Sequence, residues 1–374
     1  MIRYLLLFFS FCFFSAKAQI PIASPNTKCS LLTVSAGNQL YSLYGHTGLR
    51  FYDEQQGFDF VVNFGYFDFS TPNFYLKFVK GDLKYFVGID RYEDFYANYV
   101  FEQRGIKEQI LNLKSSEIQS IINDLAAIVN SDGRFYTYKF FHRNCTTMVA
   151  DLIAKHSSIK PAVINEIKEK SFRQIVSEYQ SPLYFENLGI NIMFGYYTDE
   201  KADAVFLPEQ LFNAYKTQGQ EVVSKTNTLN KASLTLDVPW WNSIFTLFVI
   251  LITLVFVHEY VRKFLFVVLG FIGIFLAAAG LYSEHVEVLW NYNILLFNPL
   301  LLYFAFAEKK SVRRKTIQLL AAVFVLVHLI YVLNKSQLIL FAPIYLTVFL
   351  LLLIDSELLT TIKQNRAKSL NHNI

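Results

Sequence analysis

Cysteine is scarce in this 374-residue chain, which contains only three. So few thiols exclude the small disulfide-dense scaffolds of many secreted proteins. Residues 1–18, "MIRYLLLFFSFCFFSAKA", include Cys12 and read as a secretory signal peptide with a small-x-small cleavage site. The apolar run Leu5–Phe14 is too short to span a bilayer. The exported chain would keep Cys29 and Cys145, which either form a disulfide or stay free.

Metal-ligand spacings, repeats and low-complexity tracts are also lacking. The pair His258-Glu259 is not followed by a second histidine at the metalloprotease interval, so we expect no metal and no cofactor. Charged residues make up only 17% of the chain, with a net charge of +4. Because much of this basic excess falls in a few short loops, it does not indicate a nucleic-acid partner.

Long apolar runs are present, and they are confined to the C-terminal part. The chain is 53% hydrophobic with a mean hydropathy of +0.30, and the excess begins after Pro239. We predict five membrane spans of roughly twenty residues: 241–258, 263–282, 288–307, 316–334 and 337–354. Three asparagines interrupt the third span, which makes it the weakest of the five.

The basic residues predict an orientation. Arg262-Lys263, "EKKSVRRK" (308–315) and "KQNRAK" (363–368) are basic, whereas the intervening loops 283–287 and 334–337 are not. Positive loops stay in the cytoplasm, so the part before the spans is predicted to lie on the periplasmic side of the bacterial inner membrane. The predicted domains are a signal peptide (1–18), a periplasmic catalytic domain (19–215), a linker (216–239), a five-helix transmembrane domain (240–356) and a cytoplasmic tail (357–374).

The exported part reads as a single α+β domain. Residues 46–52 and 58–67 predict two strands joined by a turn at 55–57. Residues 115–130 predict an amphipathic helix with Ser115 as its cap, and a second helix begins near Asn144. The order of a hairpin followed by helices favours an α+β fold.

Cys145 stands at the start of that second helix, in "KFFHRNCTTMVADLI" (139–153). The free N–H groups and positive dipole at a helix N-terminus lower the pKa of a thiol there. His142 and Arg143 add positive charge nearby. The pattern therefore favours a reactive thiol, although a buried structural cysteine is the simple alternative.

A nucleophilic thiol needs a base, and His46 is the best placed of the exported histidines. His156 falls at the far end of its helix, and His142 lies in a strand-like entry. In a simple hairpin, residue 46 falls opposite residues 63–64, so Asn63 can stand beside His46 and orient it. This predicts a Cys–His–Asn arrangement; ordinary strand residues are the alternative.

Longer stretches resemble known families. The order of histidine strand, polar residue on the next strand and cysteine at a helix start resembles circularly permuted papain-like enzymes such as lecithin–retinol acyltransferase and its relatives. The stretches "SLLTVSAGNQLYSLYGHTGLRF", "VVNFGYFDFSTPNFYLKFVKGDLKYF", "YKFFHRNCTTMVADL" and "SEHVEVLWNYNILLFNPL" resemble the lipoprotein N-acyltransferase family called Lnb. The resemblance implies a circularly permuted papain-like exported domain followed by an all-α membrane domain, with Cys145 as nucleophile and His46 as base.

The resemblance also implies a reaction: an acyl chain moves from a phospholipid donor, through a Cys145 thioester, to the α-amine of a diacylated lipoprotein acceptor. The aromatic-rich tract 64–101 either packs in the core or lines an acyl groove. Arg50 is a candidate for the donor phosphate, or else a surface arginine. Further candidates for substrate binding are Tyr44, Asn144, His285 and Asn291. The alternatives are a cell-wall thiol amidase or peptidase, and a non-enzymatic membrane sensor with a Cys29–Cys145 disulfide.

Overall fold

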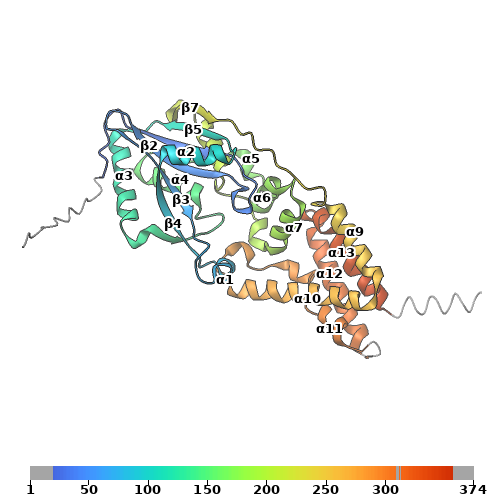
Figure 1. The fold of residues 1–374 in the computed structure, drawn as a ribbon. Helices are drawn as coiled ribbons and strands as arrows, with labels where there is room; N and C mark the ends of the chain where they lie inside the picture. Colours follow the sequence, from blue (N-terminus) through green and yellow to red (C-terminus); the bar gives the residue numbers. More distant parts are fainter. Residues whose placement is uncertain (1–19, 309–310, 312, 357–374) are drawn as a thin grey trace, which may run out of the picture.

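The computed structural model describes residues 20–308, 311 and 313–356 (Figure 1). A sheet domain comes first in the chain, and a bundle of apolar helices follows it. The predicted signal peptide 1–18, with Cys12, and the predicted cytoplasmic tail 357–374 lie outside the described residues.

One antiparallel sheet of seven strands forms the frame of the sheet domain in the described chain, in the order β6-β4-β3-β2-β1-β5-β7. The strands are β1 Lys28–Val34, β2 His46–Asp53, β3 Phe58–Tyr66, β4 Lys84–Arg91, β5 Ile106–Leu111, β6 Phe135–Thr137 and β7 Val223–Asn230. The predicted strands 46–52 and 58–67 correspond to β2 and β3 at the centre of this sheet.

Helices cover both faces of the sheet. They are α1 Phe74–Lys80, α2 Tyr92–Phe101, α3 Ser115–Val129, α4 Cys145–His156, α5 Asn165–Lys168, α6 Phe172–Gln180, α7 Tyr184–Met193 and α8 Pro208–Thr217, with short 3₁₀ turns η1 Leu40–Ser42, η2 Asp132–Arg134, η3 Tyr196–Asp199 and η4 Gly219–Glu221. The larger core joins Phe51 of β2 to Ile121 of α3 and Val149 of α4. On the opposite face, Val61 of β3 packs with Phe95 of α2. The α+β prediction is confirmed.

Two local predictions need correction. Ser115 is the first residue of α3, and Lys114 is the N-cap; its backbone N–H donates to Glu117 Oε2 at 2.8 Å. The predicted linker 216–239 is wrong over Val223–Asn230, which form β7 and pair with β5. Because β7 is a largely exposed edge strand, it carries no apolar alternation from which the sequence could predict it.

The C-terminal part contains α9 Ile244–Val257, α10 Glu259–Tyr282, η5 Val286–Val288, η6 Tyr292–Leu295, α11 Leu301–Phe306, α12 Arg313–Val332 and α13 Gln337–Asp355. Of the described residues, three helices are long and apolar enough to cross a membrane: α10, α12 and α13. Helix α9 is apolar but shorter. His258 separates it from α10 with an extended backbone, and its side chain caps α10 by accepting from the Tyr260 N–H at 3.3 Å.

The third predicted span, 288–307, is not one helix. It begins at the last residue of η5 and contains the 3₁₀ turn η6 and the six-residue α11. Asn291 and Asn293 interrupt it by bonding to the backbone of the sheet domain, at Ile192 O (2.8 Å) and Asn191 O (2.9 Å) respectively. The irregular segment packs tightly on α10, where a Cβ at Gly273 would lie 1.7 Å from Phe297 O. Only glycine permits that approach.

Besides the bonds of Asn291 and Asn293 and those that join α7 to Leu340 and Asn242, two further sets of contacts attach the sheet domain to the membrane helices. At the first, the 283–287 segment bonds to the end of α1, with the Glu284 N–H 2.6 Å from Lys80 O. At the second, Asp199 of η3 accepts from Arg173 Nε at 2.7 Å and from Lys335 Nζ at 2.6 Å. Figure 1 shows α1 beside the end of α10, and α7 against the opposite part of the bundle.

Candidate active site

Cys145 is the first residue of α4, as the sequence predicts. Asn144 caps the helix, and its Oδ1 accepts from the N–H groups of Thr146 at 2.9 Å and Thr147 at 3.0 Å. This cap places the thiol in the first helical turn, where the helix dipole favours an anion. The Asn144 amide also donates to Phe140 O at 2.7 Å and to Phe206 O at 2.9 Å. These hydrogen bonds shape the turn, and they explain why Asn144 stands there without any contact to a substrate.

His46 and Asn63 meet, although not in the predicted register. In the hairpin Gly48 pairs with Asn63, so residues 63–64 do not lie opposite His46. The two side chains still share one face of neighbouring strands, one diagonal step apart. His46 Nε2 lies 2.8 Å from Asn63 Oδ1. Continuing the register places Gly65 opposite His46; it has φ +102°, and a Cβ there would lie 3.9 Å from that of Cys145.

Asp90 is the third side chain in a row of hydrogen-bonded residues, His46–Asn63–Asp90, and the sequence did not predict it. Its Oδ2 accepts from Asn63 Nδ2 at 2.7 Å and from the Tyr66 hydroxyl. Because a carboxylate only accepts, the Asn63 amide must point its nitrogen at Asp90 and its oxygen at His46. The proton of neutral His46 is then on Nε2, which leaves Nδ1 to face Cys145.

Cys145 and His46 shift each other's ionisation. Desolvation alone would raise the pKa of the Cys145 thiol, but the charge and hydrogen bond of His46, with hydrogen bonds from the Thr47 backbone and the Thr146 hydroxyl, lower it below its ordinary value. Desolvation opposes charge on His46 too, yet its contacts with Cys145 and Asn63 raise the imidazole pKa. The geometry thus favours a thiolate–imidazolium pair at a partly exposed position.

Comparison with known families agrees with the resemblance. A model of the Lnb N-terminal periplasmic domain matches residues 17–177, and a model of the Lnb transmembrane domain matches residues 238–366. The chain belongs to the Lnb family. Neither the curated proteins nor the solved structures contain a match to the chain. Membership makes this a membrane protein with a periplasmic domain and a role related to lipoprotein N-acylation.

Arg50 is engaged elsewhere in this Lnb-family protein. Its guanidinium donates to both carboxylate oxygens of Asp59, at 2.8 and 2.6 Å, and to Glu108 at 3.0 Å. It also lies 3.4 Å from the ring centre of Tyr92. These contacts compensate its charge within the sheet, so the structure gives Arg50 a structural explanation in place of the predicted phosphate contact.

The other predicted binding residues are placed apart from one another. The Tyr44 hydroxyl accepts from Gln180 Nε2 at 2.6 Å, and its ring packs on Phe140. His285 and Asn291 belong to the attachments between domain and bundle: His285 Nε2 lies 3.0 Å from Phe78 O, and Asn291 holds the end of α7. Tyr44 and Cys145 both pack against the larger core, whereas His285 and Asn291 hold the attachments of the domain to the bundle.

Both described cysteines are free thiols. Cys29 is fully buried in β1, and burial raises its thiol pKa. The Cys29–Cys145 disulfide of the sensor alternative is therefore contradicted. The histidines set aside have other partners, since His142 bonds to the Tyr197 hydroxyl at 2.6 Å and His156 to Asp124 at 2.8 Å.

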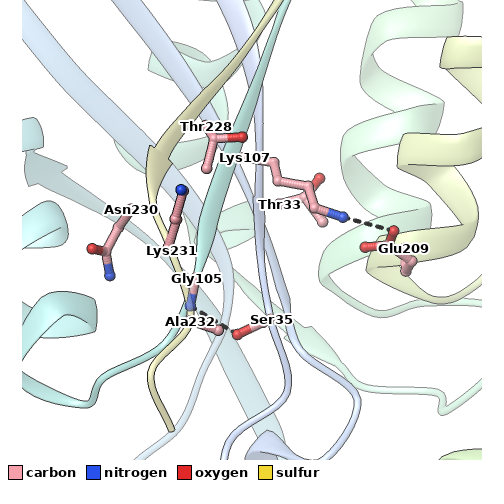
Figure 2. Close-up of a pocket in the computed structure, with 9 residues that line it drawn as sticks. All are labelled: Thr33, Ser35, Gly105, Lys107, Glu209, Thr228, Asn230, Lys231 and Ala232. Atoms are coloured by element: carbon pink, nitrogen blue, oxygen red, sulfur yellow. Dashed lines mark hydrogen bonds and ion pairs between the residues drawn. The ribbon is translucent and has the colours of Figure 1, made fainter.

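A pocket of about 250 Å³ lies beside the edge of the sheet formed by β1, β5 and β7 (Figure 2). It is lined by polar side chains, among them Lys107, whose Nζ contacts Glu209 at 2.9 Å. Neither Cys145 nor His46 lines it, so this pocket is separate from the thiol. Among the described residues, no three His, Cys, Asp or Glu side chains are grouped so as to hold a metal ion.

Proposed function

We propose that this Lnb-family protein is a lipoprotein N-acyltransferase that uses a thiol. It moves an acyl chain from a phospholipid through a Cys145 thioester to the α-amine of the diacylglyceryl-cysteine on a lipoprotein. The observation that carries the proposal is the pairing of Cys145 at the N-terminus of α4 with His46, which Asn63 orients. Nucleophile, base and orienting group are the parts that acyl transfer through a thiol requires.

In the first step the Cys145 thiolate attacks the carbonyl carbon of a phospholipid ester. The carbon–oxygen bond to the glycerol breaks as the thioester forms, and the imidazolium of His46 gives its proton to the departing alcohol. The products are a lysophospholipid and the acyl-enzyme. The raised pKa of His46 keeps that proton available in the resting pair.

In the second step the acceptor amine attacks the thioester. Neutral His46 takes a proton from the amine, the carbon–sulfur bond breaks, and the Cys145 thiolate is restored together with an amide. An α-amine has a reference pKa near 8, so an imidazole is a suitable base. The bond from Asn63 keeps the His46 ring in position through both steps.

The position of α1 supports a membrane donor. Its side chains Tyr75, Leu76 and Phe78 are exposed, and its C-terminal end is bonded to the segment that follows α10, with Ser283 Oγ 2.8 Å from Val79 O. The exposed apolar surface of α1 therefore continues that of a helix long enough to cross the membrane. A lipid surface is the environment that such a surface favours.

Aromatic rings lead from α1 towards the thiol. Phe74 of α1 packs on Phe67 with ring centres 5.9 Å apart, Phe67 on Tyr85 at 5.3 Å, and Tyr85 stacks on Tyr138 at 4.6 Å. Desolvation, followed by the nearby charge of Cys145, raises the pKa of the Tyr138 phenol. These rings supply an apolar route for an acyl chain and keep water away from a thioester.

The remaining sequence predictions belong to the same proposal. The signal peptide directs export, the basic loops keep the membrane helices oriented in the inner membrane, and residues 19–215 carry the catalytic centre. The chain order His46, Asn63, Cys145, with a helix start at the cysteine, supports the circularly permuted papain-like arrangement.

The test is to trap the intermediate. Full-length protein incubated with phospholipid vesicles should gain one acyl mass on Cys145, which neutral hydroxylamine releases. A diacylated lipopeptide should then discharge the enzyme and yield a hydroxylamine-resistant amide, whereas the same peptide with a blocked α-amine should not. Release of free fatty acid without any amide would make the protein a hydrolase and contradict the proposal.

A further inference from the structure

Glu287 in η5 is a buried carboxylate that the mechanism above does not use. Its side chain is almost inaccessible, since the residue is 3% exposed. Within the described part of the chain, neither carboxylate oxygen has a hydrogen-bond partner. His285 Nδ1 lies 3.6 Å from Oε2, which is within ion-pair distance when the imidazole is protonated but too long for a hydrogen bond. Burial of a carboxylate without hydrogen bonds lowers the stability of the fold, so the presence of Glu287 at this position needs an explanation.

The segment that carries Glu287 lies against the turn that leads into the nucleophile. Glu287 O accepts from the Gly195 N–H at 2.7 Å, which fixes the backbone of η5. Lys139, which begins the turn before Cys145, donates through Nζ to Glu284 O at 2.8 Å. The pKa of the adjacent Tyr138 is raised by desolvation and, in addition, by the charges of Cys145 and Glu287. Both charges therefore act on the same phenol, which belongs to the residue before Lys139 in the chain.

The cationic side chains near this junction are paired with other groups. Arg173 binds Asp199 at 2.7 Å and the carbonyl oxygens of Phe194 and Gly195 at 3.1 Å. Lys139 bonds to backbone oxygens, and Arg143 lies over the Tyr136 ring at 5.3 Å. His285 is charged only when it is protonated, so a permanent cation that joins Glu287 is expected to come from a substrate.

We propose that the Glu287 carboxylate is a recognition site for a primary ammonium group of a substrate. An ammonium has three N–H donors and one positive charge, so it satisfies both orphaned oxygens and neutralises the carboxylate. The inference rests on the proposed function, which offers two sources of this chemistry: the α-ammonium of the lipoprotein acceptor and the headgroup of phosphatidylethanolamine. Glu287 binds and orients; His46 remains the base.

The test separates the two half-reactions in Glu287→Gln, which keeps the shape and removes the charge. Loading of Cys145 is followed by mass spectrometry, with vesicles of phosphatidylglycerol or of phosphatidylethanolamine. The loaded enzyme is then discharged with increasing concentrations of diacylated lipopeptide. Glu284→Gln, an exposed carboxylate three residues away, is the matched control, and Glu287→Asp keeps the charge.

If the acceptor is the source, Glu287→Gln loads normally from both lipids and needs at least about tenfold more lipopeptide for half-maximal discharge, the effect of losing one charged contact. If the headgroup is the source, only loading from phosphatidylethanolamine slows. In both cases Glu287→Asp regains part of the function, and Glu284→Gln matches the parent protein. Unchanged rates in Glu287→Gln, or an equal loss with both lipids and with the lipopeptide, would overturn the proposal. A parent protein that never forms a thioester would instead refute the proposed function.

Discussion

Asp90 Oδ2 lies 2.7 Å from Asn63 Nδ2, and this contact decides which way the Asn63 amide faces. Without it the amide can rotate and present its nitrogen to His46, where it repels the Nε2 proton. We therefore expect the carboxylate of Asp90 to be a positioning group that acts on the thiol through Asn63 and His46.

Asp90→Asn should therefore slow acyl-enzyme formation by about ten- to a hundredfold, because it removes part of the rate enhancement that a positioned base supplies. The affinity for phospholipid should change little, because Asp90 contacts the row and not the reacting atoms. The pH profile of Cys145 alkylation should shift to higher pH, because the interaction between Cys145 and His46 weakens. Asp94→Asn, an exposed residue on α2, is the matched control; identical behaviour of the two variants would remove Asp90 from the site.

The thiolate itself is testable by alkylation. Cys145 has a lowered pKa and His46 a raised one, so the thiolate forms at a lower pH than in an ordinary cysteine, and the imidazolium persists to a higher pH than in an ordinary histidine. Iodoacetamide should label Cys145 at pH values where an ordinary thiol is protonated and unreactive. In His46→Ala this reactivity should fall, because desolvation then dominates and the pKa of the thiol rises.

Cys29 serves as the internal control in the same experiment. Its thiol is buried and its pKa is raised, so it should be labelled only after unfolding. Labelling of Cys29 at the rate of Cys145 would contradict the assignment of the nucleophile.

The contact of Arg173 with Asp199 predicts a large effect on stability. Arg173 is 1% exposed and joins α6 to η3 and α7. Arg173→Ala should lower the free energy of unfolding by about 3–5 kcal/mol, because it leaves buried acceptors unpaired. Lys170 lies just before the same helix and makes a partly exposed contact with Glu178. Lys170→Ala should therefore lower the free energy of unfolding by less than about 1 kcal/mol. Thermal unfolding in detergent measures both.

The membrane topology can be mapped with truncation fusions. A reporter active only in the periplasm should work when fused at residue 235 or after 284, and should be silent when fused after 311 or 363. The reason is the basic bias of the loops that are predicted to be cytoplasmic. Activity after 311 would contradict the predicted orientation, since that loop carries the strongest basic signal.

The sequence predicted what depends on local patterns. Strand alternation and turn residues predict the β2–β3 hairpin, and the Asn144 cap predicts the start of α4. Cys145, His46 and Asn63 could therefore be named from the sequence. The register was misjudged because it depends on the exact turn at residues 54–57, where Asp53 pairs with Phe58.

The missed features depend on distant parts of the chain. Asp90 reaches Asn63 only because β4 pairs with β3, and nothing near Asp90 in the sequence indicates that pairing. Arg50 looked available because its partner Glu108 is on β5, two strands away. The third span was predicted, although as the weakest, because apolar residues surround Asn291 and Asn293, and the bonds of these asparagines to α7 could not be read from the sequence.

The sheet domain is attached to the membrane helices through α1 and through Asp199, among other contacts, and under the proposed function we expect these attachments to hold Cys145 at one distance from the bilayer. A domain held at one point would swing and reach amines at many distances from the membrane. A domain held at two points reaches only those that stand at one level. Under the proposed function, the α-amine of a diacylated lipoprotein is kept at such a level by its own acyl chains, so we expect anchorage of enzyme and acceptor in one membrane to favour the terminal residue by position.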